Sequence, residues 1–362
     1  MSEEKTLANA FGQENFSAEA LVAGKARSSH NGGAERRETP DIDIAIKGRR
    51  GKKGASDEKR LISFVNTIAR NSPFGRAVLE DAAKDGYTLI MENQEDSCGF
   101  CDKGSKIIAL NPQLSDSLLV ATLAHESRHA QQFSRGAEDR FGVFNVKSEI
   151  MYTRAMEADA ETAAAATCHE IRVNSGNAGP WNDFSADSVI IAAGFMAAAP
   201  SKDAPINDKM LQGAFNGWYK DVPMMEAYEE GYIVDVMREA AKGPKEAMPA
   251  YDQKANSEEI VNLFCSNAEG KCYWADKPQV LEERDKLSIA AGTYNSAKMF
   301  FNVRKMKTGK EPDSSLEEMK VRFDFFEEYG KARETQSSYS IKGPKKGYAA
   351  AQIAALLQKK QR

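Results

Sequence analysis

The pentapeptide His-Glu-Ser-Arg-His at residues 125–129 constrains this chain more than any other feature of the sequence. Residues four apart lie about 40° apart around an α-helix and roughly 6 Å apart along it, so His125 and His129 leave the same face. Two imidazoles in that arrangement can hold one zinc ion, with Glu126 beside them as a general base. The chain has only four histidines, so the pattern arises by chance about once in a few hundred such chains. The alternative is a surface helix that carries two solvated histidines.

The residues around this pentapeptide predict a helix from 115 to 135. Ser115 and Asp116 are candidates for the N-cap, and Gly136 ends the segment. Leu, Val and Ala fill most positions from 118 to 124. The histidines therefore lie on or beside the apolar side of this helix, where polar groups need partners.

A third ligand has to come from another part of the chain, because hydrolytic zinc sites usually have three protein ligands and one open position. The extension HExxHxxGxxH is absent, since Gln132 stands where that pattern has Gly and Arg135 where it has His. Residues 156–162 instead predict an alanine-rich helix on which Glu157 and Glu161 share a face. We predict Glu157 as the third ligand, and Glu161 as the acceptor of a hydrogen bond from the far ring nitrogen of one histidine. An acidic helix face without ligands is the alternative.

The segments GYTLIMEN, KIIALNP, LAHESRHAQQF and MEADAE resemble the gluzincin branch of zinc metallopeptidases, and more closely an uncharacterised bacterial family of metallopeptidases. This resemblance covers residues 86–170. It implies a zincin-like core, with a β-hairpin or small sheet, an active-site helix and a third-ligand helix, within a predominantly helical α+β fold. It also implies one zinc ion per chain, held by His125, His129 and Glu157. Glu126 would then act as the general base in the hydrolysis of peptide bonds of a protein or peptide substrate.

Sites of this kind normally contain a further donor that stabilises the oxyanion formed beside the metal. Tyr152, Arg154 and His169 are the nearby candidates, and the sequence does not choose among them. A structural role is favoured for His169, which is an isolated histidine beside Cys168.

Two short β-type runs, 87–91 and 106–110, precede the histidine helix and predict a β-hairpin. The resemblance implies that a sheet edge beside the metal takes up an extended peptide as an added strand. The polar segment between the runs contains Cys98 and Cys101. Unlinked thiols are the favoured interpretation, because a structural zinc needs four ligands and the sequence has no second CxxC. A redox-sensitive or metal-linked hairpin is the alternative.

Composition narrows the class of protein. A hydrophobic fraction of 41% is ample for a core, and a net charge of −4 gives no general attraction to nucleic acid. Five cysteines without regular spacing argue against a disulfide-stapled secreted fold. The start of the chain lacks a signal-peptide pattern, and no run approaches the ~20 apolar residues of a membrane span. We therefore expect a cytoplasmic protein, with export by another route as the alternative.

The chain is expected to contain an N-terminal segment, a catalytic domain and a helical region. Residues 1–56 are predicted to be largely disordered. Solvated linker is the favoured interpretation of the alternating run 41–46 within them, and docking as a strand is the alternative. Residues 57–200 are assigned to the zincin-like metallopeptidase domain, and residues 201–335 to a helical C-terminal extension.

Apolar and aromatic side chains in this extension fit helical spacing and are interpreted as core: Met210, Leu211, Phe215, Trp218, Met225, Tyr228 and Tyr232. Residues 336–362 form a basic tail. A soluble terminal helix is the favoured interpretation of this tail, and weak contacts with a membrane, nucleic acid or protein partner are the alternative.

Two hypotheses from different classes follow. The first is an active zinc metallopeptidase, which predicts that Glu126→Gln abolishes activity while the metal is retained. The second is a catalytically inactive, zincin-like helical interaction protein, associated for example with a mobile element or a secretion system. It predicts binding that survives both the substitution and removal of the metal.

Overall fold

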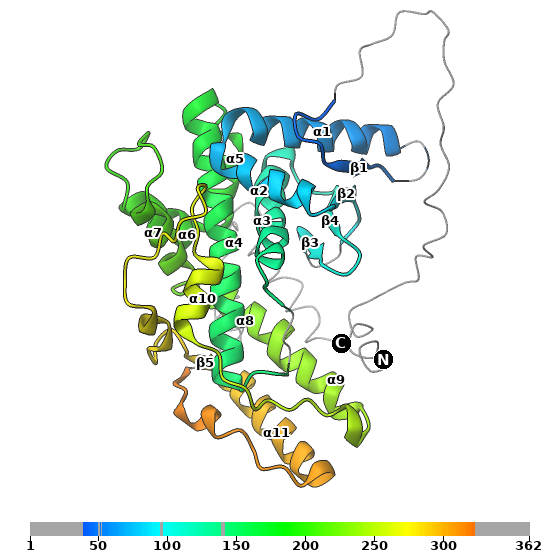
Figure 1. Cartoon of the computed structure of the whole chain (residues 1–362), viewed down its shortest axis with the longest axis vertical. Coiled ribbons are helices and arrows are strands. Elements are labelled where there is room, and N and C mark those ends of the chain that lie inside the picture. The colour runs from blue at the N-terminus through cyan, green and yellow to red at the C-terminus, as the bar shows by residue number, and fades with distance from the viewer. Residues whose placement is uncertain (1–38, 50, 52, 95–96, 139–141, 323–362) are drawn as a thin grey trace, which may run out of the picture. The chain divides into compact units, whose positions relative to one another are not determined.

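A long helix packs against more of the other elements than any other helix does in the computed structural model, which describes residues 39–49, 51, 53–94, 97–138 and 142–322 (Figure 1). This helix, α4 (Val146–Ser175), has 30 residues. Helix α3 (Asp116–Ser134) packs along it, and α1 (Gly54–Asn71) and α2 (Pro73–Lys84) pack against both. Together with one small mixed sheet, these helices give the predominantly helical α+β fold that the sequence predicts.

The sheet contains β1 (Ala45–Lys47), β2 (Thr88–Met91), β3 (Gly99–Asp102) and β4 (Ile107–Leu110) in the order β1-β2-β4-β3. β2 runs parallel to both β1 and β4, whereas β3 is antiparallel to β4. The predicted hairpin between residues 87–91 and 106–110 is therefore wrong. The connection between those two runs is long enough to return the chain to the same direction, and it contains β3, which forms the actual hairpin with β4.

Strand β1 lies inside the segment that the sequence predicts to be disordered. Ala45 pairs with Thr88 of β2, and the side chains of Ile42 and Ile44 just before the strand are buried. The interpretation of residues 41–46 as solvated linker is wrong, because burial of these isoleucines fixes the alternating run against the sheet. Residues 1–38 lie outside the described residues, so the prediction for them stays a prediction.

Helices α3 and α4 begin where their sequences provide caps. The Ser115 side chain accepts a hydrogen bond from the Leu118 backbone N–H, and Asn145 caps α4 in the same way through Ser148. These bonds satisfy N–H groups that have no partner within the helix. The predicted start of α3 is confirmed. Small alanines at Ala163–Ala166, all buried, let neighbouring helices approach α4 closely.

The chain after α4 is mainly helical. Its elements are α5 (Gly179–Asp187), α6 (Val189–Ala197), α7 (Asp208–Trp218), α8 (Val222–Glu229), a π-helical segment η3 (Glu230–Asp235), α9 (Val236–Lys242), η4 (Lys245–Ala247), α10 (Ser257–Phe264), η5 (Pro278–Glu282), α11 (Ala291–Thr308) and η6 (Ser314–Glu318), with short parallel strands β5 (Ile289–Ala290) and β6 (Val321–Arg322).

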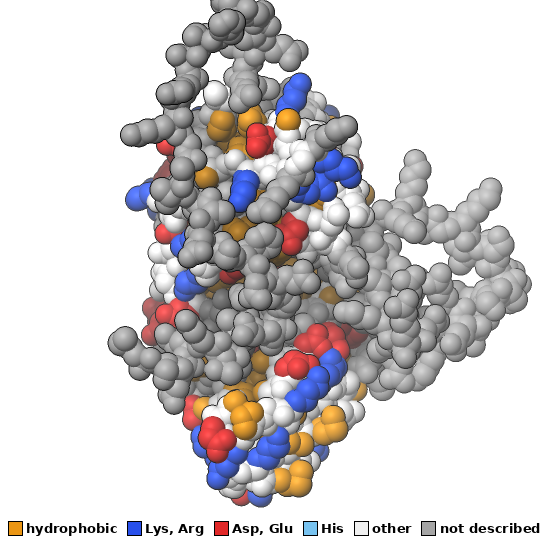
Figure 2. All heavy atoms as spheres, turned by 90° about the vertical axis from the view of Figure 1, so that its right-hand side faces the viewer, with side chains coloured by type: hydrophobic (Ala, Val, Ile, Leu, Met, Phe, Trp, Pro, Cys, Tyr) orange, Lys and Arg blue, Asp and Glu red, His pale blue; other side chains and the backbone are white. Residues whose placement is uncertain are grey.

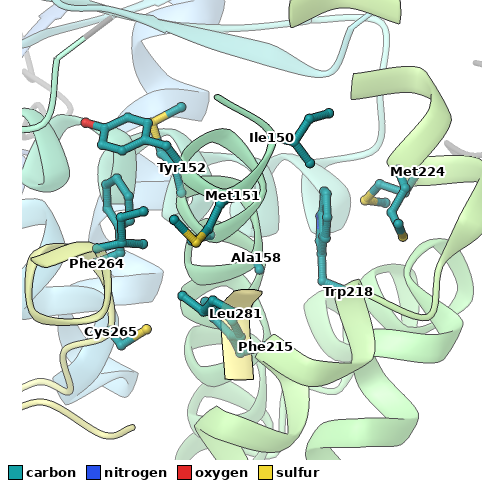
Figure 3. Packing of buried hydrophobic residues seen from close by; sticks show 14 of the residues in the cluster. Ile150, Met151, Tyr152, Ala158, Phe215, Trp218, Met224, Phe264, Cys265 and Leu281 are labelled. Atoms are coloured by element: carbon teal, nitrogen blue, oxygen red, sulfur yellow. The ribbon is translucent and has the colours of Figure 1, made fainter. Parts of the chain in front are cut away.

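Two hydrophobic clusters form the core. One joins the sheet to α1, α2 and α3, and the other joins α4 to the later helices. Figure 3 shows the second cluster, where Trp218 of α7 lies among side chains of α4 and α8. Phe215 and Trp218 are fully buried, which confirms their assignment to the core. This cluster contains residues from both sides of residue 200, where the domain boundary is predicted.

The surface gives two further observations. On the face shown in Figure 2, Lys and Arg side chains of the described residues are interspersed with Asp and Glu, which agrees with the small net charge. Among the described residues, no helix has the length and apolar composition that a membrane span requires. The basic tail at 336–362 lies outside the described part of the chain.

Candidate metal centre

Helices α3 and α4 bring three potential ligand atoms together. The Nε2 atoms of His125 and His129 are 3.0 Å apart, and Oε2 of Glu157 lies 3.5 Å from the first and 3.4 Å from the second. A tetrahedral zinc ion with bonds of about 2.0–2.1 Å separates its ligand atoms by about 3.3–3.4 Å. The triangle formed by these three atoms therefore has the dimensions of one face of a zinc site.

The proton on the His129 ring can be assigned from its neighbour Gln132. The Gln132 amide nitrogen donates to the Met156 carbonyl at 3.0 Å and to Asp159 Oδ2 at 2.7 Å. Both partners are acceptors, so the amide oxygen has to be the atom that faces His129 Nδ1, 2.9 Å away. His129 Nδ1 then donates to this oxygen, and the lone pair of its Nε2 is directed at the triangle.

The same reasoning applies to His125. Its Nδ1 lies 3.4 Å from Oε1 of Glu161, whose other carboxylate oxygen accepts from the Ser188 hydroxyl at 3.4 Å. An ionised carboxylate only accepts hydrogen bonds, so the proton of His125 belongs on Nδ1. The structure thus places Glu161 beside the far nitrogen of one histidine, on the same helix as Glu157.

Three lone pairs consequently converge without a proton between them. The side chain of Glu157 is only 1% exposed, yet its Oε2 atom has no hydrogen-bond partner. Isolated buried acceptors are costly, and three that face one another are more so. The donor set of two imidazole nitrogens and one carboxylate oxygen suits zinc. These residues therefore fit a metal cation.

The electrostatics of the site favour positive charge at this point. Burial alone would lower the pKa of His125 and His129, but the carboxylates around them, Glu157 above all, raise both pKa values. Burial alone would raise the pKa of Glu157, but the two imidazoles hold it well below its usual range. Without a metal, the same groups would bind protons instead.

Glu126 is the second carboxylate within reach of the imidazoles. Ligand atoms of His125, Glu126 and His129 all lie within 4.8 Å of one another. Glu126 follows His125 directly and so lies about 100° further around α3. Burial raises the pKa of Glu126, although the imidazoles of His125 and His129 oppose this. Glu157 Oε2 faces both Nε2 atoms directly, so the geometry favours Glu157 over Glu126 as the ligand.

Strand β3 lies directly over Glu126. A Cβ atom at Gly99 would be 2.6 Å from the Ala109 carbonyl, 2.9 Å from Thr122 and 3.4 Å from Cγ of Glu126, so glycine permits the close approach of β3 to α3. Cys98 precedes the strand and is buried, and burial raises the pKa of its thiol. A raised thiol pKa disfavours the reactive thiolate.

Tyr232 belongs to the site, although its sequence spacing assigns it only to the core. Its hydroxyl donates to Oε1 of Glu157 at 2.8 Å, and its ring stacks on Tyr228 with centroids 5.6 Å apart. Tyr232 lies in the π-helical segment η3, and such segments occur often at functional sites. No local pattern announces a π-helical turn, so this contact could not be found from sequence.

None of the three proposed oxyanion donors is at the triangle. The Tyr152 hydroxyl accepts from the Glu138 backbone N–H, Arg154 forms a buried ion pair with Glu229 at 2.7 Å, and His169 Nε2 contacts the Ala204 carbonyl at 2.8 Å. Tyr152 and Arg154 precede Glu157 on α4, but positions five and three residues away lie about 140° and 60° around the helix from it. Their polar groups are engaged elsewhere, so this geometry gives no support to an oxyanion role for these three candidates, and the contact of His169 agrees with the structural role favoured for it.

Comparison with known proteins gives one match. No curated protein and no solved structure matches the chain. The family described as "Putative metallopeptidase family (DUF6782)" matches residues 45–274, which extend from β1 to the residues just after α10. The matched region is wider than the resemblance over residues 86–170, and it includes the triangle, Glu161 and Tyr232. Since it covers more than half of the sequence, the chain belongs to this metallopeptidase family.

Proposed function

We propose that the protein is a zinc-dependent peptidase with one zinc ion per chain, held by His125, His129 and Glu157. The observation that carries this proposal is the convergence of two imidazole nitrogens and one buried carboxylate oxygen, at separations of 3.0, 3.4 and 3.5 Å. The name of the family supports peptidase activity. Glu161 and Gln132, which accept hydrogen bonds from the far nitrogens of the two histidines, would keep both Nε2 atoms unprotonated.

Zinc bound here would polarise the peptide carbonyl and make water acidic enough to react near neutral pH. We assign the general base to Glu126. Its carboxylate accepts a proton from the attacking water and delivers it to the nitrogen of the leaving amine, so that the peptide C–N bond breaks. A carboxylate whose pKa is raised by burial suits this exchange, because it is a stronger proton acceptor than an ordinary carboxylate.

We infer that the substrate is a protein or peptide bound in extended conformation along β3. All four residues of β3 are partly exposed, and among the described residues β3 pairs only with β4, which leaves its other edge open. An extended peptide can add to such an edge by main-chain hydrogen bonds. Gly99 brings this strand against Glu126, so the added peptide would pass beside the proposed base.

The proposal is tested by metal content and peptide hydrolysis of the full-length chain. We expect about one zinc per chain in the wild type and in Glu126→Gln, and none in His129→Ala. Loss of a general base typically costs 10²–10⁴-fold, so hydrolysis of a peptide library by Glu126→Gln should fall by roughly this factor. A wild-type chain without zinc, or a Glu126→Gln variant with undiminished hydrolysis, would refute the proposal.

A further inference from the structure

The chain departs from the three-histidine zinc pattern HExxHxxGxxH at two positions, and the side chains at both positions form polar contacts. Gln132 stands where that pattern has Gly, and its amide oxygen accepts from His129 Nδ1. Arg135 stands where the pattern has His, and it contacts the Ser266 hydroxyl. Both residues therefore belong to one group of polar contacts between α3 and the chain just after α10.

The centre of this group is a buried ion pair. Arg128 of α3 binds both oxygens of Asp159 of α4, at 2.7 and 3.0 Å. Asp159 also accepts from Gln132 at 2.7 Å and from the Tyr273 hydroxyl at 3.0 Å. Arg128, Asp159, Gln132 and Tyr273 are each about 1% exposed. Every step from the ion pair to the His129 ring is thus a direct hydrogen bond in the interior.

The other side of Arg128 is held by backbone after α10. Its guanidinium donates to the Phe264 carbonyl at 2.9 Å and to the Ser266 carbonyl at 2.7 Å. Ser266 in turn forms a β-bridge with Cys272, next to Tyr273. Carbonyl groups accept only, so Arg128 is the donor in both bonds, and its other bonds run to Asp159 and to the Gln131 side chain.

We propose that Gln132, Asp159 and Arg128 are positioning residues that fix the orientation and tautomer of His129, and that residues 264–273 hold the far end of this relay. The proposal rests on the proposed function, in which His129 Nε2 is a zinc ligand. Asp159 orients the Gln132 amide so that its oxygen faces His129, and that oxygen holds the proton on Nδ1. His125 uses the carboxylate of Glu161 for the same purpose, so the two histidines are oriented by different chemistry.

A purely structural role explains this arrangement less well. Desolvation of both charges opposes the attraction within a buried ion pair, so such a pair is weak evidence for stability. Apolar side chains could fill the same space between α3 and α4. The contacts instead form a directed path that ends on the ring nitrogen opposite the proposed ligand atom, where outer contacts of metal sites typically act.

The test compares three variants of the full-length chain. Gln132→Met removes the acceptor from His129. Gln132→Glu keeps an acceptor oxygen there and, because two adjacent carboxyl groups share one proton, its protonated form still has an O–H to donate to Asp159 in place of the amide. Ser127→Ala is the control, because Ser127 is a fully buried polar neighbour on α3 whose hydroxyl has no hydrogen-bond partner and so bonds neither an imidazole nor the relay. Zinc affinity is measured by competition with a chromophoric chelator. We expect Gln132→Met to weaken zinc binding 10–100-fold, and the other two variants to stay much closer to the wild type.

A second measurement does not depend on zinc. The sequence has four histidines, so long-range ¹H–¹⁵N spectra of the metal-free chain, recorded at a pH high enough for the rings to be neutral, can resolve each ring and its tautomer. The wild type and Gln132→Glu should show His129 protonated on Nδ1, and Gln132→Met should show a mixture of tautomers. If Gln132→Met does not fold, Tyr273→Phe, which removes one hydroxyl at the far end, should show a smaller change in the same direction.

The outcomes separate this inference from the proposed function. If the wild type binds no zinc, the proposed function fails, while the spectra still test the relay. If Gln132→Met and Tyr273→Phe both bind zinc as the wild type does and keep Nδ1 of His129 protonated, the relay is refuted. Equal loss of zinc affinity in Ser127→Ala and Gln132→Met would also refute it, because the effect would then be one of general stability.

Discussion

Removal of a single hydroxyl by Tyr232→Phe should weaken zinc binding without loosening the fold. The Tyr232 hydroxyl donates to Oε1 of Glu157 at 2.8 Å, on the carboxylate whose Oε2 faces both imidazoles. Phenylalanine keeps the ring that stacks on Tyr228 and loses only this donor. The outer oxygen of Glu157 is then left without its partner, and the carboxylate can rotate away from the triangle.

The expected magnitude follows from the charge on the acceptor. A hydrogen bond to a charged group contributes about 1.5–3 kcal/mol. Since 1.4 kcal/mol corresponds to a factor of ten, the substitution should weaken zinc binding by about 10–150-fold. Contacts to ligands in other metal sites typically contribute 10–100-fold, which gives a similar range.

Tyr219→Phe is the matched control for this experiment. Its hydroxyl is buried and has no hydrogen-bond partner, so its removal costs no contact and should leave zinc binding unchanged. Zinc affinity is measured by chelator competition, and thermal unfolding of the metal-free chain reports the fold. If Tyr232→Phe and Tyr219→Phe bind zinc within twofold of the wild type, the bond from Tyr232 does not hold the ligand and the reasoning is wrong.

Two further predictions concern pH. Burial raises the pKa of Glu149 well above 4.5 and one of its oxygens has no partner, so the ionised carboxylate destabilises the fold above that raised pKa and not below pH 4.5. Glu149→Gln should thus raise the free energy of unfolding at pH 8 by about 1–3 kcal/mol and leave it nearly unchanged at pH 4, as measured in denaturant; a loss of stability at pH 8 would contradict this. The pKa values of His125 and His129 are raised above 6.5, and both rings must lose protons to bind zinc, so zinc affinity should decrease as the pH falls through these values. Calorimetry in two buffers would count the protons released. Equal zinc affinity at pH 8 and pH 6 would exclude the mechanism.

Local patterns in the sequence predicted the helical part of the site well. Ser115 caps α3 as expected, and Glu157 and Glu161 lie on one face of α4, because residues four apart share a face on any helix. The partner of Glu161 is a histidine on the neighbouring helix α3. Only the motif at residues 125–129 made it possible to predict that this helix faces Glu161. Short-range geometry therefore explains most of the successful predictions.

Pairings between distant segments were not predictable in this way. β1 has three residues and pairs with β2 across α1 and α2, so its own composition did not distinguish a strand from a linker. β2 and β4 run parallel because β3 lies between them in the sequence and pairs with β4. The hydrophobic periodicity of the sequence does not predict this pairing. Gln132 is a partial exception, because it follows His129 by three positions on one helix. That spacing could have suggested their contact.

The proposed metal centre has a consequence for how the protein is made. Its groups come from residue 125 to residue 273, and the last of them, Tyr273, bonds Asp159 in the middle of α4. Contacts between residues so far apart in sequence form only after much of the chain is available to fold. A nascent chain that has been synthesised only as far as α4 would carry the histidine motif and Glu157, but neither Tyr232 nor the carbonyls that hold Arg128. If the site acts as proposed, hydrolysis would begin only after the chain has been synthesised beyond residue 273. By then the chain is folded, and its own peptide bonds are less accessible to the site.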